Sequence, residues 1–121
     1  MPLRRRKDFE ISFYEGVIKR APNYVEALIP LAEAYTRRGF YKEGLEMDKR
    51  LSRLCQDDPI IHYNLACSFA LLGQDKEALL SLQRAVALGY NQFNYLLRDP
   101  DLKPLHRHPE FQKLLQKNSK L

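Results

Sequence analysis

The sequence contains no tryptophan, only two cysteines and no long run of apolar residues. A helix that crosses a bilayer needs about 20 consecutive, mostly apolar residues, and no stretch of this chain has that composition. The first ten residues, MPLRRRKDFE, also lack the apolar segment of a secretory signal. We therefore expect a cytoplasmic protein that does not enter a membrane.

Sequence motifs for catalysis are absent as well. The chain has no glycine-rich phosphate loop, no HExxH and no GxSxG. His62, His106 and His108 form no evident set of metal ligands, because the last two lie only two residues apart, which is a poor arrangement on a helix. Cys55 and Cys67 lack a CxxC spacing, and we expect them to be reduced, structural thiols. We expect no enzymatic activity, no metal and no cofactor.

The composition that is present is typical of one globular domain. Hydrophobic residues make up 45% of the 121 residues and charged ones 29%, which is too apolar for a disordered chain. The net charge is +5, but the basic run at residues 4–7 supplies four of these charges. That run has no interleaved aromatic residues, so it is more typical of a solvated tail than of a nucleic-acid site. We do not expect nucleic acid as the partner.

A 34-residue period is the main pattern in the chain. When residues 25–58 are laid over residues 59–92 without a gap, identical residues recur at many positions. Within each unit apolar residues recur every three or four positions, which indicates amphipathic helices, and a glycine marks the end of the first one. Each unit is therefore predicted to be a helical hairpin. The identical pairs include Leu31 and Leu65, Ala32 and Ala66, Gly39 and Gly73, and Leu45 and Leu79.

The ends of the helices can also be predicted. Proline follows Asp58, Asp99 and His108, and it favours the first turn of a helix, while Asn23 is expected to cap another start. Pro30 lies inside a predicted helix, so we expect a kink there. The predicted helices span about 8–20, 24–38, 41–55, 59–72, 75–88, 92–97, 100–106 and 109–117.

These features resemble the tetratricopeptide repeat (TPR) family. The family has a leucine and a small residue followed by an aromatic in the first helix, a glycine at the turn and a small residue in the second helix. The first unit departs from this pattern at Gly44 and Leu51. The resemblance implies an all-α superhelix of about two and a half hairpins: a half-repeat at 8–23, repeats at 25–58 and 59–92, and a capping segment at 93–121. The second unit matches the pattern with Leu65, Ala66, Phe69, Gly73, Ala78 and Ala85.

The last part of the chain is similar to the closing segment of many bacterial TPR domains. In those segments a DPDL motif, a leucine and a Pro-Glu-Phe motif precede a final pair of leucines, and residues 99–115 keep this order. Phe111, Leu114 and Leu115 share one face of a predicted helix. We expect this face to cap the last hairpin, with Lys113 and Lys117 in water.

The resemblance implies a protein-binding role. In the family the first helices line a concave surface that holds an extended peptide or a helix of a partner. Carrying these positions over gives Ile29, Glu33 and Arg37 in the first repeat, and Ile60, Tyr63, Asn64, Cys67 and Leu71 in the second.

Two of these positions have alternative interpretations. Asn64 matches an asparagine that family members use to bind a peptide backbone, but a solvated surface amide is the alternative. Tyr63 is suited to anchor a partner, and equally to pack against Ile29 or the terminal helix. Chaperone-tail binding is not expected, because only Asn64 matches the residues that grip a terminal carboxylate. The predicted groove is more apolar than ionic, so it suits an amphipathic helix. The alternatives are a groove filled by the chain itself, and self-assembly with a second copy through the groove or an open repeat end.

Overall fold

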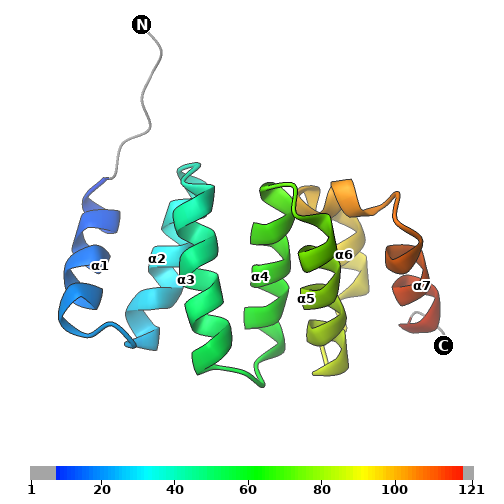
Figure 1. Cartoon of the computed structure of the whole chain (residues 1–121), viewed down its shortest axis with the longest axis horizontal. Helices are drawn as coiled ribbons and strands as arrows, with labels where there is room; N and C mark the ends of the chain where they lie inside the picture. Colours follow the sequence, from blue (N-terminus) through cyan, green and yellow to red (C-terminus); the bar gives the residue numbers. More distant parts are fainter. Residues whose placement is uncertain (1–7, 119–121) are drawn as a thin grey trace, which may run out of the picture. The chain divides into compact units, whose positions relative to one another are not determined.

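The computed structural model describes residues 8–118, and the basic run at residues 4–7 lies outside that range. The described residues form helices and turns, with no β-strand among them (Figure 1). The predicted all-α fold is confirmed, and each helix end lies within one residue of its predicted place. The elements are α1 (Phe9–Arg20), α2 (Val25–Arg37), α3 (Tyr41–Leu54), α4 (Pro59–Leu71), α5 (Asp75–Ala87), α6 (Phe93–Arg98), the 3-10 helix η1 (Pro100–Leu105) and α7 (Pro109–Asn118).

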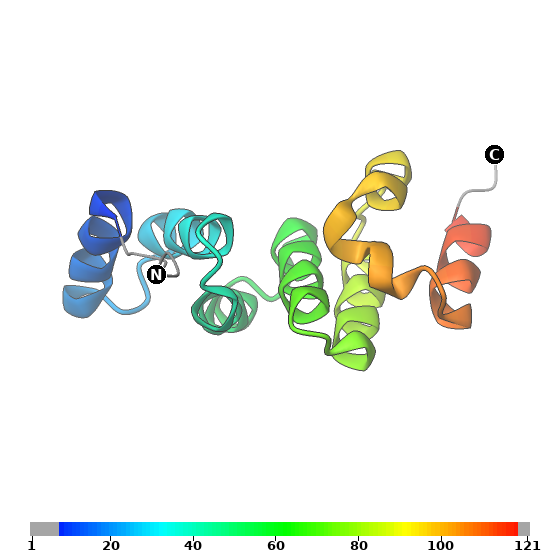
Figure 2. The same ribbon diagram turned by 90° about the horizontal axis from the view of Figure 1, so that it is seen from above.

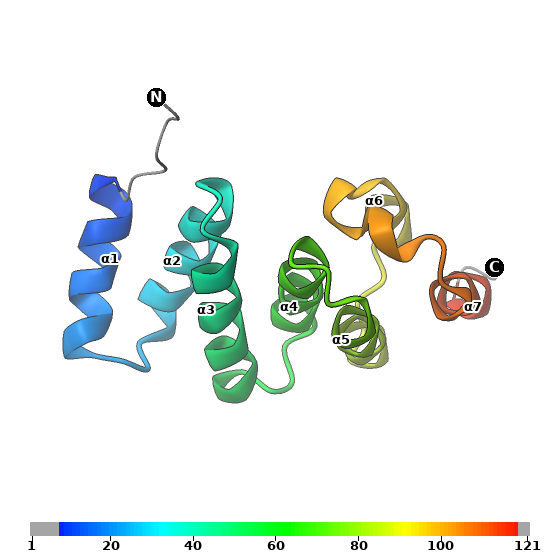
Figure 3. The same cartoon turned by 45° about the horizontal axis from the view of Figure 1, so that its top comes forward.

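The chain divides after Gln56 into two compact units. This division lies within two residues of the predicted boundary between the two repeats. Unit 1 contains α1 and the hairpin of α2 and α3, and unit 2 contains the hairpin of α4 and α5 followed by α6, η1 and α7 (Figures 2 and 3). Within residues 8–118, no helix has both the length and the apolar character needed to cross a bilayer.

Glycine forms the turn of each hairpin, as the sequence predicts. Gly39 and Gly73 have φ angles of 86° and 75°. Residues other than glycine rarely adopt this backbone conformation. The next backbone N–H in each case donates back to a carbonyl of the first helix, Phe40 to Tyr35 and Gln74 to Phe69. The turns therefore end the first helix and start the second in the same way in both repeats.

Unit 1 is built around α2. Its apolar face buries Leu28 and Leu31 completely, and Ile11 of α1 is buried as well. The departure from the family pattern at Gly44 has a steric reason, because a Cβ built there would lie 2.7 Å from Oγ1 of Thr36. The two helices of this hairpin thus approach closely at Gly44.

The start of α2 differs from the prediction. Asn23 does not cap the helix: the N-cap residue is Tyr24, and it makes no side-chain capping bond. The helix then continues from Val25 to Arg37 through Pro30. By contrast, the expected cap of α4 is present, since the Asp58 carboxylate accepts hydrogen bonds from the backbone of Ile60 and Ile61.

Unit 2 is built around α4, which is covered on two sides. The helix has no charged residue, and eight of its thirteen residues are buried. It packs against α5 in the hairpin and also against η1, which follows much later in the chain. A helix that is apolar all round is one that neighbours cover on more than one side, and α4 fits that rule.

The C-terminal segment completes unit 2. Residues 100–105 form a 3-10 helix, with Pro104 inside it, where the sequence predicted a short helix of unspecified type. Leu96, Leu102 and Leu105 are fully buried. In α7 Phe111 is also fully buried against the unit, whereas Leu114 and Leu115 are half-buried and the two lysines are exposed. The capping role thus depends mainly on Phe111.

Candidate functional site

The predicted binding residues of unit 2 lie on α4 but differ greatly in exposure. Ile60, Asn64, Cys67 and Leu71 are spaced by four, three and four residues, so they follow one face of the helix. Ile60 is 52% exposed, and Asn64 and Leu71 are half-buried. Tyr63 and Cys67 are buried. The residues that the resemblance groups together therefore divide into an accessible set and an interior set.

Tyr63 is held by residues of the C-terminal segment. Its ring stacks on Tyr90 with the centroids 4.4 Å apart, and its hydroxyl donates a 2.5 Å hydrogen bond to Asp99. Burial, together with the nearby Cys67 and Asp99, raises the pKa of Tyr63 above its usual value, so the phenol stays protonated and remains a donor. The prediction that Tyr63 lines an open groove is wrong, because the chain itself occupies the space in front of the ring.

Cys67 belongs to the same interior cluster. Its Sγ lies 3.6 Å from a carboxylate oxygen of Asp99, and burial raises the pKa of the thiol, with the charge of Asp99 adding to the effect. A protonated, buried thiol is a poor nucleophile and has no access to a partner. The prediction that Cys67 lines an open groove is therefore wrong as well, because the side chain is buried. The second cysteine, Cys55, is free and lies just after the end of α3.

Asp99 connects α4 to η1. One oxygen accepts from Tyr63 and Cys67, and the other accepts a 3.0 Å bond from the backbone N–H of Asp101. Cys67, Asp99 and Asp101 place potential ligand atoms within 4.8 Å of one another. A metal ion there would have to displace the donors that Asp99 already binds. We therefore interpret the cluster as a structural hydrogen-bond network.

The charge of Asp101 gives a testable pH dependence. Partial burial, and then the neighbouring Asp99, raise the pKa of Asp101 above 3.8. A carboxyl whose pKa is raised in the folded state is destabilising when ionised, and this penalty disappears as the pH falls through the folded pKa. We expect Asp101→Asn to raise the unfolding free energy at pH 7 by less than about 1 kcal/mol, with little change near pH 4. Urea unfolding of both proteins at the two pH values tests this, and a gain of equal size at both would contradict it.

Three accessible residues remain around the buried cluster in unit 2. The side-chain amide of Asn64 makes no hydrogen bond within residues 8–118. Ile60 lies one turn away on α4, and Tyr95 of α6 is 58% exposed with its ring 6.2 Å from that of Tyr63. Sequence reasoning missed Tyr95, because α6 had been assigned only a capping role. We call Ile60, Asn64 and Tyr95 the amide strip.

In unit 1 the predicted residues lie on α2. Ile29 is half-buried, and Glu33 is exposed and makes no ion pair with any residue in the range 8–118. Arg37 is paired with Glu10 of α1, with a guanidinium nitrogen 3.2 Å from the carboxylate. Arg38 pairs with Asp8 in the same way, at 2.6 Å. Arg37 is therefore engaged with α1, which leaves Ile29 and Glu33 as the free predicted positions of this unit.

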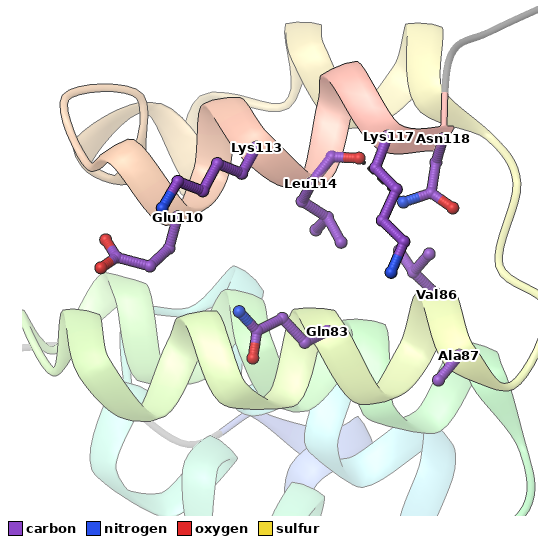
Figure 4. Close-up of a pocket in the computed structure, with 8 residues that line it drawn as sticks. All are labelled: Gln83, Val86, Ala87, Glu110, Lys113, Leu114, Lys117 and Asn118. Carbon is purple, nitrogen blue, oxygen red and sulfur yellow. Dashed lines mark hydrogen bonds between the residues drawn. The ribbon is translucent and has the colours of Figure 1, made fainter.

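A second feature of unit 2 is an open cleft between α5 and α7, which the sequence did not predict (Figure 4). It has a volume of about 400 Å³. Val86 and Ala87 of α5 and Leu114 of α7 supply its apolar walls, and Lys113 and Lys117 of α7 contribute to its polar lining. Figure 4 shows Leu114 and Lys117 extending from α7 towards α5. The two lysines had been expected simply to be solvated.

Comparison with known proteins gives limited similarity. No family model matches the chain. The chain is 29% identical over 85 residues to a protein of Arabidopsis thaliana whose name describes it as chloroplastic. The matching part covers 68% of this chain but 25% of that protein, so the chain spans about a quarter of the length of this curated relative.

Proposed function

We propose that this chain is a protein-interaction module of the TPR kind, which binds a peptide or a helix of a partner protein on its first helices. The observation that carries the proposal is the amide strip of unit 2. Asn64 has a donor and an acceptor that the fold leaves unused, and exposed apolar surface lies close to it. A half-buried amide in this setting is suited to pair with the backbone of a bound segment.

The chemistry of the strip favours a partner with apolar side chains. Ile60 and the ring of Tyr95 offer apolar contact, and the Tyr95 hydroxyl adds a polar edge. Neither Ile60 nor Asn64 is charged, so salt is expected to affect binding only weakly. In unit 1 Ile29 and Glu33 are the corresponding candidates for contact.

Affinity capture with matched variants tests the proposal. The wild-type chain and an Ile60→Ser/Asn64→Ala variant would be used as bait in cell lysate, with Leu54→Ser as a control at an exposed leucine of α3. A partner that is retained by the control and lost with the double variant is expected. A partner that binds all three baits equally would contradict binding through the strip. Tyr63→Ala is unsuitable here, because it removes a buried side chain and would confuse unfolding with loss of binding.

A second candidate function is self-association, and the outer face of α1 favours it. Phe9 is 85% exposed and Phe13 is 54% exposed, and their rings stack with the centroids 6.3 Å apart. Aromatic rings are enriched in protein interfaces, so an exposed pair of this kind is suited to contact a second copy. Sedimentation velocity over a concentration series distinguishes the two functions: a dimer that disappears in Phe9→Ser/Phe13→Ser supports self-association, and a monomer at all concentrations rejects it.

A further inference from the structure

The α5–α7 cleft continues into an uncharged surface of α5 that the fold does not need. Leu80, Gln83 and Ala87 follow one face of α5 at spacings of three and four residues. Leu80 is 59% exposed, and Gln83 and Ala87 are exposed as well. The equivalent positions of the first repeat, 34 residues earlier, are all charged. They are Glu46, Lys49 and Arg53.

This contrast between the repeats matters because both helices play the same part in their hairpins. A charged residue at each of these positions is compatible with the hairpin, as α3 demonstrates. In α5 the helix instead presents an exposed leucine and an alanine next to the cleft. α7 leaves Leu80 largely uncovered, so packing within the unit does not account for the apolar side chain.

The charges around the cleft indicate what kind of segment fits it. Lys113 and Lys117 are one turn apart on α7, both are exposed, and neither makes an ion pair with another residue of the described range 8–118. Glu110 is the one acidic residue among those that line the cleft. Lys117 extends from α7 towards α5 with its ammonium nitrogen directed at Val86, so its charge lies within the cleft, where a bound segment would meet it (Figure 4).

We propose that the α5–α7 cleft and the adjoining face of α5 form a second docking surface, which binds an acidic amphipathic segment of a partner protein. Leucine-like side chains of that segment lie against Val86, Ala87 and Leu114, while its carboxylates pair with Lys113 and Lys117. This surface is separate from the amide strip, so it extends the proposed function to a second and chemically different partner segment.

The test uses a fluorescein-labelled peptide of sequence EELLEELLEE and its basic counterpart KKLLKKLLKK. Fluorescence anisotropy is expected to show tighter binding of the acidic peptide, with an affinity that falls as salt is added. Lys113→Glu/Lys117→Glu is expected to weaken this binding about tenfold or more, because attraction becomes repulsion at two positions. Ala87→Leu fills the cleft without a change in charge and is expected to weaken binding too.

The controls separate a docking surface from general attraction to a basic protein. Lys76→Glu/Lys103→Glu makes the same change in net charge at exposed lysines that do not line the cleft, and it is expected to bind as the wild type does. Equal weakening by both lysine pairs would overturn the proposal. So would loss of binding in Ile60→Ser/Asn64→Ala, which would place the peptide on the amide strip. A wild-type dimer that Lys113→Glu/Lys117→Glu dissociates would also overturn it, because the occupant would then be a second copy of the chain.

Discussion

Replacement of Phe111 with alanine is expected to lower the unfolding free energy of unit 2 by about 3 to 5 kcal/mol. Phe111 is fully buried, and its ring stacks on His106 with the centroids 4.8 Å apart. It is the one fully buried side chain of α7, so its loss removes the main apolar contact between that helix and the unit. Nε2 of His106 is buried and makes no hydrogen bond in the described part of the chain. Water that enters the cavity would satisfy it, so we expect the lower end of this range.

Native-state hydrogen exchange measured by NMR suits this test, because it follows each unit separately. The amide protons of α7 are expected to lose protection first, and those of α2 in unit 1 to keep theirs. Gln116→Ala, at an exposed position of the same helix, is the matched control and should change stability by less than about 0.5 kcal/mol. Unchanged protection of α7 in the Phe111→Ala protein would show that this side chain does not hold the helix.

Asp99→Ala is expected to cost about 3 kcal/mol, for a different reason. The substitution removes the acceptor of the buried Tyr63 hydroxyl and also the side-chain cap of η1. The buried hydroxyl is then left without a partner, which costs more than the hydrogen bond itself contributes. Asp99→Asn is expected to cost only about 1 kcal/mol, since its amide oxygen still caps η1 and its NH₂ group can donate to the Tyr63 oxygen.

A double-mutant cycle checks the assignment to Tyr63. If the carboxylate acts through the phenol, Tyr63→Phe and Asp99→Ala together will cost less than the sum of the two single changes. Additive effects, or a loss below about 1 kcal/mol for Asp99→Ala, would contradict the network. Chemical denaturation followed by circular dichroism provides all four values.

The hairpins could be predicted because local patterns specify them. Helical periodicity, Gly39 and Gly73 at the turns, and Asp58 before a proline each act over a few residues, and the repeat shows the same pattern twice. The local pattern gave a wrong prediction at Asn23, which was expected to cap α2. The helix begins one residue later than predicted, and its start has no side-chain cap. Packing of α2 within unit 1 is sufficient to hold that helix start.

The candidate site could be predicted only in part. Ile60 and Asn64 of α4 are accessible, but Tyr63 is buried and its partner lies 36 residues away in the chain. Nothing in the local pattern of α4 reveals that contact. The helix α4 contains no charged residue, and η1 covering one side of it accounts for this composition. The cleft was missed because it depends on how α5 and α7 pack.

Asp99 and η1 follow α4 by about 30 residues in the chain, so the ribosome synthesises them after the helix that they cover. The α4–α5 hairpin joins neighbouring segments and can form as soon as both helices have emerged, whereas the η1 side of α4 is covered only after residue 105 has been made. Until then a helix without a single charge has an apolar side in contact with water. During this interval the nascent chain is most exposed to aggregation and to chaperones that recognise apolar segments.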